Sequence, residues 1–349
     1  MNAGSGATPL ATSPLNSVES ARPHLPVLLR EVLVALAPRD GEVYVDGTFG
    51  AGGYSRAVLQ AAGSLVGVDR DPEALIAAAD LEAEFPGRFK FLQGCFGDLD
   101  ALLEDNNVTE IHGVMLDLGV SSMQLDQAER GFSFMRDGPL DMRMSQSGVS
   151  ASDVVNGYDE QDLATILYVY GEERRSRAIA KAIVTKREQA PITRTFDLVE
   201  LVTSVLGHPR GKKKGAHPAT RTFQALRIFL NNELGELIRG LMAAEKCLAP
   251  GGRLVVVTFH SLEDRIVKKF LTARTGQGGR PSRYMPDVET QAPSFESQGK
   301  RSVSPSDEEV STNSRSRSAR LRSAVRTTAA PWPEDDLLPR NAPQLEVLS

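Results

Sequence analysis

Cysteine is scarce in this chain: Cys95 and Cys247 are the only two, and they lie far apart in the sequence. A secreted disulfide scaffold and a Cys-based zinc site need more cysteines, and the H-x-E with P-C-x-x-C pattern of zinc base deaminases is missing here. We expect both to be ordinary core residues. The chain also lacks a run of 18 apolar residues and a secretory leader pattern, so a soluble, cytoplasmic protein without a membrane partner is expected.

A general excess of positive charge is missing as well. The net charge of the 349 residues is −5, which by itself does not favour a polyanionic partner. Between residues 171 and 227, however, 13 Lys or Arg stand against 5 Asp or Glu, and this local excess of +8 includes Lys212, Lys213 and Lys214. Such a cluster can neutralise phosphates. A solvated helix face is the commoner explanation of a charge run, so an RNA or DNA partner needs support from elsewhere.

Glycine, in contrast, is concentrated where a ligand could approach the backbone. Residues 43–70 predict a strand that ends in Asp46, a turn with four glycines, a helix, and a second strand that ends in Asp69. Glycine has no Cβ to obstruct a ligand, and a carboxylate after the second strand can accept both hydroxyls of a ribose. Nicotinamide dinucleotide sites and S-adenosylmethionine sites both use this arrangement.

The spacing of the loop favours S-adenosylmethionine. In the dinucleotide fingerprint G-x-G-x-x-G follows the strand directly, and a pyrophosphate rests on the amides of the helix N-terminus. Here Asp46 precedes the glycines in D-G-T-F-G-A-G-G, so its negative charge would lie where the pyrophosphate belongs. A zwitterionic methionine moiety with a sulfonium tolerates that acid. A glycine-rich turn without a cofactor is the alternative, because glycine motifs alone are weak signals.

Further strand patterns predict an open α/β sheet. Short apolar runs occur at residues 88–93, 113–117 and 253–259, a long helix is predicted over 222–248, and a last strand within 315–326. The ligand site of such a sheet lies at the carboxyl ends of its strands. The residues expected there are Asp46, Asp69, Phe96, Asp117 and His260. The expected fold class is therefore α/β: a class I S-adenosylmethionine-dependent methyltransferase with a Rossmann-like, mostly parallel sheet.

More than a hundred residues between the fourth and fifth strands show little strand character, too many for a simple crossover. Helical patterns over 159–170, 174–189 and 195–206 predict an inserted all-helical domain that lies over the cofactor site and grips the substrate. The expected divisions are a disordered extension over 1–22, a first methyltransferase part over 23–128, the insert over 129–221, a second methyltransferase part over 222–327 with a mobile loop at 275–313, and a tail over 328–349.

Seven sequence blocks together resemble one family, the bacterial 16S ribosomal RNA cytosine-N4 methyltransferases known as RsmH or MraW. The blocks are HLPVLL at 24–29, DGTFGAGG at 46–53, LDLGVSS at 116–122, ERGFSFMRDGPLDMRM at 129–144, YGEER at 170–174, HPATRTFQALRI at 217–228 and FHSLEDRIVK at 259–268. They follow the order of the family and cover roughly residues 24–327. The resemblance implies the substrate, a decoding-centre cytidine of 16S rRNA in the small ribosomal subunit.

The resemblance also implies a set of residues that bind S-adenosylmethionine: Gly52, Gly53, Tyr54, Asp69, Phe96, Asp117 and Gln124. The family usually has His at the position of Tyr54, and from the sequence alone Phe96 could equally be a core aromatic. Methyl transfer to N4 of cytidine needs an amine held in line with the methyl group. No strong base is needed before transfer, because the methylated amine is acidic and can lose its proton afterwards. Asp117 is the candidate catalytic acceptor, with a pure cofactor contact as the alternative.

A base inside helical RNA cannot present N4 to a buried methyl group, so the target cytidine is expected to be unstacked. The candidate substrate contacts are Arg136, Asp141, Arg143 and His260, with Phe132 and Phe134 as walls of the pocket. Each has a structural alternative. Asp141 would pair with Arg143 or Arg136, His260 would orient its loop, and the two phenylalanines would pack the insert on the sheet.

Two other functions stay open. A DNA amino-methyltransferase is disfavoured because its [DNS]-P-P-[FYW] motif is replaced by D-L-G-V at 117–120. A ribosome-assembly factor without catalysis is disfavoured by the intact glycine loop and by Asp69. A nicotinamide oxidoreductase is less favoured than either. The expected partner is 16S rRNA within the small subunit, no metal is expected, and the sequence allows a homodimer.

Overall fold

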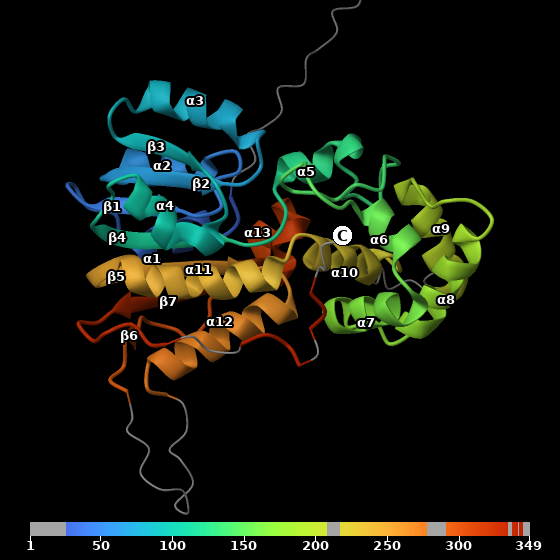
Figure 1. The fold of residues 1–349 in the computed structure, drawn as a ribbon. Coiled ribbons are helices and arrows are strands. Elements are labelled where there is room, and N and C mark those ends of the chain that lie inside the picture. Colours follow the sequence, from blue (N-terminus) through green and yellow to red (C-terminus); the bar gives the residue numbers. More distant parts are fainter. Residues whose placement is uncertain (1–25, 208–216, 278–290, 334–336, 341, 345–349) are drawn as a thin grey trace, which may run out of the picture.

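A seven-stranded sheet forms the centre of the computed structural model, which describes residues 26–207, 217–277, 291–333, 337–340 and 342–344. The strand order is β3-β2-β1-β4-β5-β7-β6 (Figure 1). The bounds are β1 Val43–Asp46, β2 Ser64–Asp69, β3 Phe89–Gln93, β4 Ile111–Asp117, β5 Leu248–Thr258, β6 Phe295–Ser297 and β7 Arg320–Arg326. Strands β1 to β5 pair in parallel, whereas β7 and β6 are antiparallel. The predicted α/β class with a mostly parallel sheet is confirmed.

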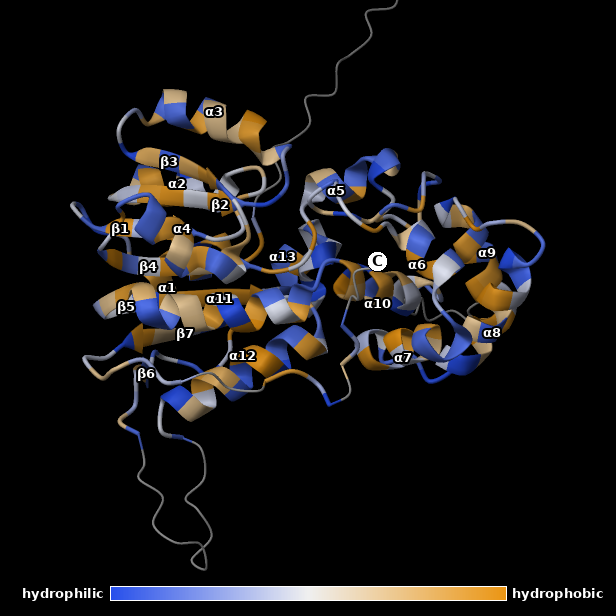
Figure 2. Cartoon of the chain, viewed as in Figure 1, coloured by the Kyte–Doolittle hydropathy of each residue, from blue (hydrophilic) through white to orange (hydrophobic). Residues whose placement is uncertain are grey.

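Helices cover both faces of this sheet, because side chains of successive strand residues point to opposite faces. The adjacent residues Met115 and Leu116 of β4 belong to two different hydrophobic clusters. The covering helices are α1 Leu29–Leu36, α2 Gly53–Ala61 and α3 Ala74–Glu84 on the Met115 side, and α4 Leu99–Asp105, α11 Glu233–Cys247 and α12 Ser261–Arg274 on the Leu116 side. Figure 2 shows the strands of the sheet dominated by hydrophobic residues, as burial on both faces requires.

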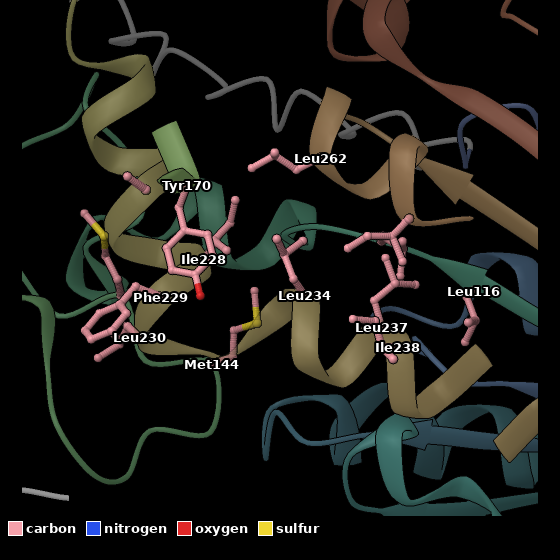
Figure 3. Packing of buried hydrophobic residues seen from close by; sticks show 14 of the residues in the cluster. Leu116, Met144, Tyr170, Ile228, Phe229, Leu230, Leu234, Leu237, Ile238 and Leu262 are labelled. Atoms are coloured by element: carbon pink, nitrogen blue, oxygen red, sulfur yellow. The ribbon is translucent and has the colours of Figure 1, made fainter. Parts of the chain in front are cut away.

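The helical insert lies beyond the carboxyl ends of the strands (Figure 1). Its helices are α6 Ala151–Gly157, α7 Glu160–Gly171, α8 Ser176–Arg187, α9 Thr195–Leu206 and α10 Thr220–Leu230, and the short α5 Ser122–Asp126 leads into it from β4. The three helices predicted from the sequence correspond to α7, α8 and α9. Figure 3 shows one packed core running from Tyr170 and Phe229 in the insert, through Leu234, to Leu237 and Leu116. The insert therefore shares its core with the sheet.

The prediction of one helix over 222–248 is wrong. The chain turns between α10 and α11, where Asn232 takes a left-handed conformation with φ 49°. Asparagine reaches this conformation at lower cost than most residues, so apolar periodicity on both sides concealed the break. Because α10 packs on α7 and α11 packs on the sheet, α10 is described with the insert, and the boundary at residue 221 stays a prediction. The other predicted boundaries stay predictions.

The predicted mobile loop over 275–313 contains regular secondary structure in the part that the structure describes, and its mobility stays a prediction. Residues 291–313 include β6 and the helix α13 Asp307–Thr312, in which the Glu309 carboxylate accepts a hydrogen bond from the backbone N–H of Leu28 at 2.7 Å. The predicted last strand is confirmed as β7. Residues 278–290, the extension over 1–22, and Lys212, Lys213 and Lys214 lie outside the described residues.

The segment after β7 returns to the insert. Leu337 is buried, and the Tyr170 hydroxyl of α7 donates a hydrogen bond to the carbonyl of Pro343 at 2.6 Å. This contact joins the insert to a segment that the sequence suggested was a separate tail. Among the helices that the structure describes, none has the length and hydropathy to cross a membrane.

Candidate cofactor and methyl-transfer site

Three carboxylates meet at one edge of the sheet, because β1, β2 and β4 end in Asp46, Asp69 and Asp117. The glycine loop closes over this edge. The backbone N–H of Gly50 donates to Asp69 Oδ2 at 2.7 Å, and Gly50 and Gly52 have φ of +52° and +74°, which non-glycine residues rarely adopt. The predicted cofactor residues of the loop and of two strands are thus brought together.

Asp46 is the deepest of the three carboxylates, with 1% of its surface exposed. The Ser55 hydroxyl donates to its Oδ2 at 2.7 Å, and the backbone N–H of Thr48 donates to its Oδ1 at 3.2 Å. Burial raises the pKa of Asp46 to about 6, although these hydrogen bonds oppose the shift. Asp46 thus fixes the first turn of α2 and the start of the loop.

Asp117 has one oxygen, Oδ1, without a hydrogen-bond partner, although the Tyr54 hydroxyl interacts with the same carboxylate. This Oδ1 is buried, while the backbone N–H of Asp117 donates to the Thr48 hydroxyl at 2.7 Å. Burial, followed by the charges of Asp46 and Glu263, raises the pKa of Asp117 well above its usual value. A small cavity borders Asp117, Asp46 and Tyr54. Because a buried acceptor without a donor is costly, Asp117 is a group that a ligand would complete.

Tyr54, which stands where the family usually has His, is buried in the first turn of α2. Its hydroxyl donates a hydrogen bond to the carbonyl of Val27. Burial, followed by the charges of Asp117 and Asp46, raises the pKa of Tyr54 well above 10, so the phenol stays neutral. The Tyr54 side chain therefore connects the segment before α1 to the helix that follows the glycine loop, and this contact does not depend on a bound ligand.

Gln124 joins the site through a further carboxylate, that of Asp71. It is the third residue of α5, whose capping box pairs the Ser121 side chain with the Gln124 backbone N–H and the Gln124 Oε1 with the Ser121 backbone N–H. The Gln124 amide nitrogen donates to Asp71 Oδ2 at 2.7 Å, and the Asp71 backbone N–H donates to Asp69 Oδ1 at 2.8 Å. Gln124 and Asp69 are thus connected through Asp71.

Phe96 follows β3 and begins the short 3₁₀ turn η1, Phe96–Asp98. Its ring packs so closely on α11 that a Cβ added at Gly240 would lie 2.4 Å from it. This contact places Phe96 partly in the core, as its structural alternative supposed. Its role beside an adenosine stays a prediction.

His260 belongs to a charged cluster at the start of α12. Its Nε2 lies 3.0 Å from Glu263 Oε1, and one ligand atom each of His260, Glu263 and Glu233 fall within 4.8 Å of one another. Such spacing would suit a cation, but the Arg227 guanidinium already binds both Glu233 oxygens, at 2.6 and 2.7 Å. Although burial opposes it, the charge of His260, its hydrogen bond and Arg227 hold the pKa of Glu263 below its usual value. We therefore interpret the cluster as an ion-pair network beside Asp117.

The other predicted substrate residues lie in the loop between η2, Ala128–Arg130, and α6. Asp141 forms an ion pair with Arg143 at 2.6 Å, the alternative that the sequence offered for it. The exposed Arg136 donates to the carbonyl of Asp126. These contacts, made within the insert and its entry, do not test a role in substrate binding, so contact of the three residues with RNA stays a prediction.

The two phenylalanines of this loop differ in their surroundings. Phe132 is buried in the shared core with the Arg130 guanidinium over its ring, which favours the packing role. Phe134 is partly buried, stacks on His217 with ring centroids 5.0 Å apart, and meets Phe223 edge-on. Packing therefore explains Phe132, whereas a place in the wall of the substrate pocket stays a prediction for Phe134.

Sequence patterns did not identify Asp71, Arg130, Glu263 or Arg227 as parts of the site. Two local signals were present: Ser121 to Gln124 and His260 to Glu263 both have the spacing of a capping box. The Arg227–Glu233 pair could not be found, because it depends on the unexpected turn between α10 and α11.

Asp46 predicts how stability depends on pH. Its folded pKa of about 6 lies above the unfolded value of 3.8, so the folded state keeps the proton longer and this group lowers the free energy of unfolding as pH rises through that window. Between pH 4.5 and 7.5 the fall should reach about 2 kcal/mol. Asp46→Asn has no carboxyl to titrate at this position, so it should escape this loss. Between pH 4.5 and pH 7.5 its free energy of unfolding should rise by about 2 kcal/mol relative to that of the original protein, as measured by urea unfolding at both pH values. An equal difference at both values would contradict the raised pKa.

The whole arrangement fits a nucleoside cofactor with a cationic methionine end. The glycine turn, the ribose-type carboxylate of Asp69 and the unsatisfied Oδ1 of Asp117 lie along one edge of a parallel sheet. Comparison with known proteins gives the same assignment: residues 21–327 match the model of the MraW methylase family. The chain belongs to this family. It is a methyltransferase of class I fold that uses S-adenosylmethionine.

Individual relatives are similar over nearly their whole length. The chain is 57% identical to the ribosomal RNA small subunit methyltransferase H of Parvibaculum lavamentivorans, over 92% of this chain and 94% of the relative. It is 55% identical to the protein of the same name from Paramagnetospirillum magneticum, over 90% and 98%. A putative rRNA-methylase structure from Clostridium thermocellum matches with a TM-score of 0.40 and 12% identity, over 87% of this chain and 99% of that chain, a likeness too low to carry an argument.

Proposed function

We propose that this methyltransferase modifies the exocyclic N4 of a decoding-centre cytidine in the 16S rRNA of the small ribosomal subunit. Two relatives at 55% and 57% identity carry the name ribosomal RNA small subunit methyltransferase H, and the sequence blocks resemble the cytosine-N4 branch of rRNA methylation. It would act in the cytoplasm, where ribosomal subunits are assembled.

The observation that carries the chemical part of the proposal is the unsatisfied Oδ1 of Asp117. When bound, S-adenosylmethionine supplies a sulfonium methyl group for direct transfer to an amine. Gly50 and Gly52 allow the left-handed turn of the loop, and Asp69 offers carboxylate oxygens to the ribose. Asp117 then accepts a hydrogen bond from the N4 amine and orients its lone pair along the transfer direction.

Proton balance gives Asp117 a second task. Formation of the N–CH₃ bond leaves the nitrogen with one proton too many, and this proton passes to an ionised Asp117 Oδ1 or to water. A buried carboxylate of raised pKa is suited to take it. His260 and Glu263 pair with each other at 3.0 Å, and the negative charge of Glu263 helps to raise the pKa of Asp117.

Exposed cations of the insert support an RNA partner. Arg177 and Lys181 are exposed on α8, and Arg174 is exposed just before it. The competing explanation, a solvated helix face, predicts that their removal has no effect on RNA binding.

The double variant Arg177→Glu/Lys181→Glu is expected to weaken binding of small subunits while the affinity for S-adenosylhomocysteine stays unchanged. Each lost phosphate contact should reduce the slope of log affinity against log salt by about 1. Filter binding at several salt concentrations measures the slope. The matched control, Glu160→Lys/Asp162→Lys at the start of α7, changes exposed charges in the opposite sense. Equal slopes for the variant and the original protein would favour the solvated-face explanation.

The reaction itself is tested with isotopically labelled S-adenosylmethionine and small subunits from a strain that lacks the enzyme. Digestion and nucleoside mapping should place the label in N4-methylcytidine at one decoding-centre position. Label in another nucleoside, or transfer to DNA, would show that the proposed cytidine is not the substrate. Cofactor binding without transfer to any subunit preparation would instead favour an assembly role.

A further inference from the structure

Asp71 is a buried carboxylate that neither the glycine loop nor the predicted cofactor contacts include. Only 3% of its surface is exposed. Its Oδ2 accepts hydrogen bonds from the Gln124 amide nitrogen at 2.7 Å and from the Arg130 guanidinium at 2.8 Å, and its Oδ1 accepts one from the backbone N–H of Glu73 at 3.1 Å. Buried acids with this many donors hold their surroundings in one arrangement.

The orientation of a glutamine amide matters for a ligand because its two ends are chemically opposite. The nitrogen end only donates hydrogen bonds and the oxygen end only accepts them. Asp71 accepts at the nitrogen end of Gln124, and the Ser121 backbone N–H donates to the oxygen end at 3.0 Å. A flipped amide would set Oε1 against the Asp71 carboxylate and the amide nitrogen against the Ser121 N–H. Both contacts would then be repulsive.

The same carboxylate also reaches the insert. Arg130, 6% exposed, donates to Asp71 and to the carbonyls of Arg143 and Met144 at 3.1 and 3.2 Å, and it lies 3.2 Å from Glu73. The position of Asp71 is therefore set from two sides: by the strand end at Asp69, and by the loop at the entry of the insert.

We propose that Asp71 is a positioning residue of the cofactor site, which fixes the Gln124 amide so that one oxygen lone pair and one N–H are presented to the cofactor in a single orientation. The inference rests on the proposed contact between Gln124 and the cofactor. It does not depend on the identity of the RNA substrate, because cofactor binding alone reports it.

A reciprocal exchange of the two side chains separates orientation from simple structural support. In Asp71→Asn/Gln124→Glu the donor and the acceptor change places, and the pair keeps its net charge beside Arg130. The carboxylate introduced at position 124 still accepts from the Ser121 N–H, and the amide introduced at position 71 can donate to the other oxygen of that carboxylate. Arg130 then loses its Asp71 Oδ2 acceptor and keeps the carbonyls of Arg143 and Met144 and the Glu73 carboxylate. Each single variant, in contrast, leaves two acceptors or two donors face to face.

The readout is the dissociation constant of S-adenosylhomocysteine, measured by titration calorimetry on the full chain, with the urea unfolding midpoint as a check on the fold. Asp71→Asn and Gln124→Glu should each weaken binding about tenfold, and the double variant should return to within about threefold of the original protein. Asp80→Asn, which changes an exposed acid on α3, should bind like the original protein.

Each other outcome is decisive. A double variant as weak as the product of the two single effects would show that Asp71 does not orient Gln124. Asp71 would also not be a positioning residue if the loss of affinity in each variant were proportional to the loss in its unfolding midpoint. Asp71 would then only support the fold. If Gln124→Ala binds the cofactor normally, Gln124 makes no useful contact, and both the proposed contact and the positioning role are wrong, whereas rRNA methylation could still be observed.

Discussion

Asp117→Asn should lower the rate of methyl transfer by about 10²–10³-fold at saturating cofactor and RNA. The substitution keeps the shape of the side chain but removes its ability to take a proton, and its amide could direct a donor at the incoming N4 amine. The measurement is single-turnover transfer to small subunits, with the dissociation constant of S-adenosylhomocysteine determined in parallel. We expect that constant to change by less than about tenfold.

The pH dependence distinguishes a proton acceptor from a cofactor contact. Burial and neighbouring acids raise the pKa of Asp117 well above its usual value, and only its ionised form accepts a proton. The transfer rate of the original protein should therefore rise with pH through that raised pKa, and Asp117→Asn should lose this dependence. A cofactor cation nearby favours ionisation and moves the rise to lower pH. Weakened cofactor binding with an unchanged maximal rate and pH profile would assign Asp117 to the cofactor alone.

Glu245→Gln should lower the free energy of unfolding by about 3 kcal/mol, because it removes the charge of one partner of the buried Arg274 guanidinium. Arg274 and Glu245 are 0% and 1% exposed, and Arg274 Nε lies 3.3 Å from Glu245 Oε2. The guanidinium also lies between the rings of Phe270 and Trp332, 4.5 and 5.1 Å from their centroids. Urea unfolding followed by circular dichroism measures the loss.

The control for this prediction is an ion pair of similar length on the surface. Arg56 and Glu84 lie 2.8 Å apart with side chains 41% and 40% exposed. Water screens that pair, so Glu84→Gln should cost at most about 1 kcal/mol. Similar losses for Glu84→Gln and Glu245→Gln would mean that burial does not determine the contribution of these pairs.

The predictable part of the fold follows from local patterns. The five parallel strands were predicted from short apolar runs, and Asp46, Asp69 and Asp117 fall at the predicted strand ends. The prediction of one helix over 222–248 was wrong because the hydrophobic periodicity continues through a turn that depends on one left-handed residue, Asn232. Hydrophobic periodicity indicates which residues are buried, but it does not indicate where the chain changes direction.

The site was predictable where residues are neighbours in the sequence and unpredictable where they meet through the fold. Gln124 and Asp71 are 53 positions apart, and Arg130 and Asp71 are 59 apart. No spacing rule connects them, since the contacts depend on how α5 returns over the end of β2. Resemblance to a family indicated Gln124, but the reason for its orientation required the three-dimensional arrangement.

The hydrogen bond between Tyr170 and Pro343 has a consequence for the order of synthesis. The two residues are 173 positions apart, so every helix of the insert leaves the ribosomal exit tunnel well before the segment that fastens it. During that interval the nascent insert has to rely on its own helix contacts and on whatever sheet strands have already emerged. Strand β5, which completes the parallel sheet, also follows the insert in the chain. Hydrophobic surfaces of the first half of the polypeptide therefore stay uncovered until the later segments that pack on them have been translated.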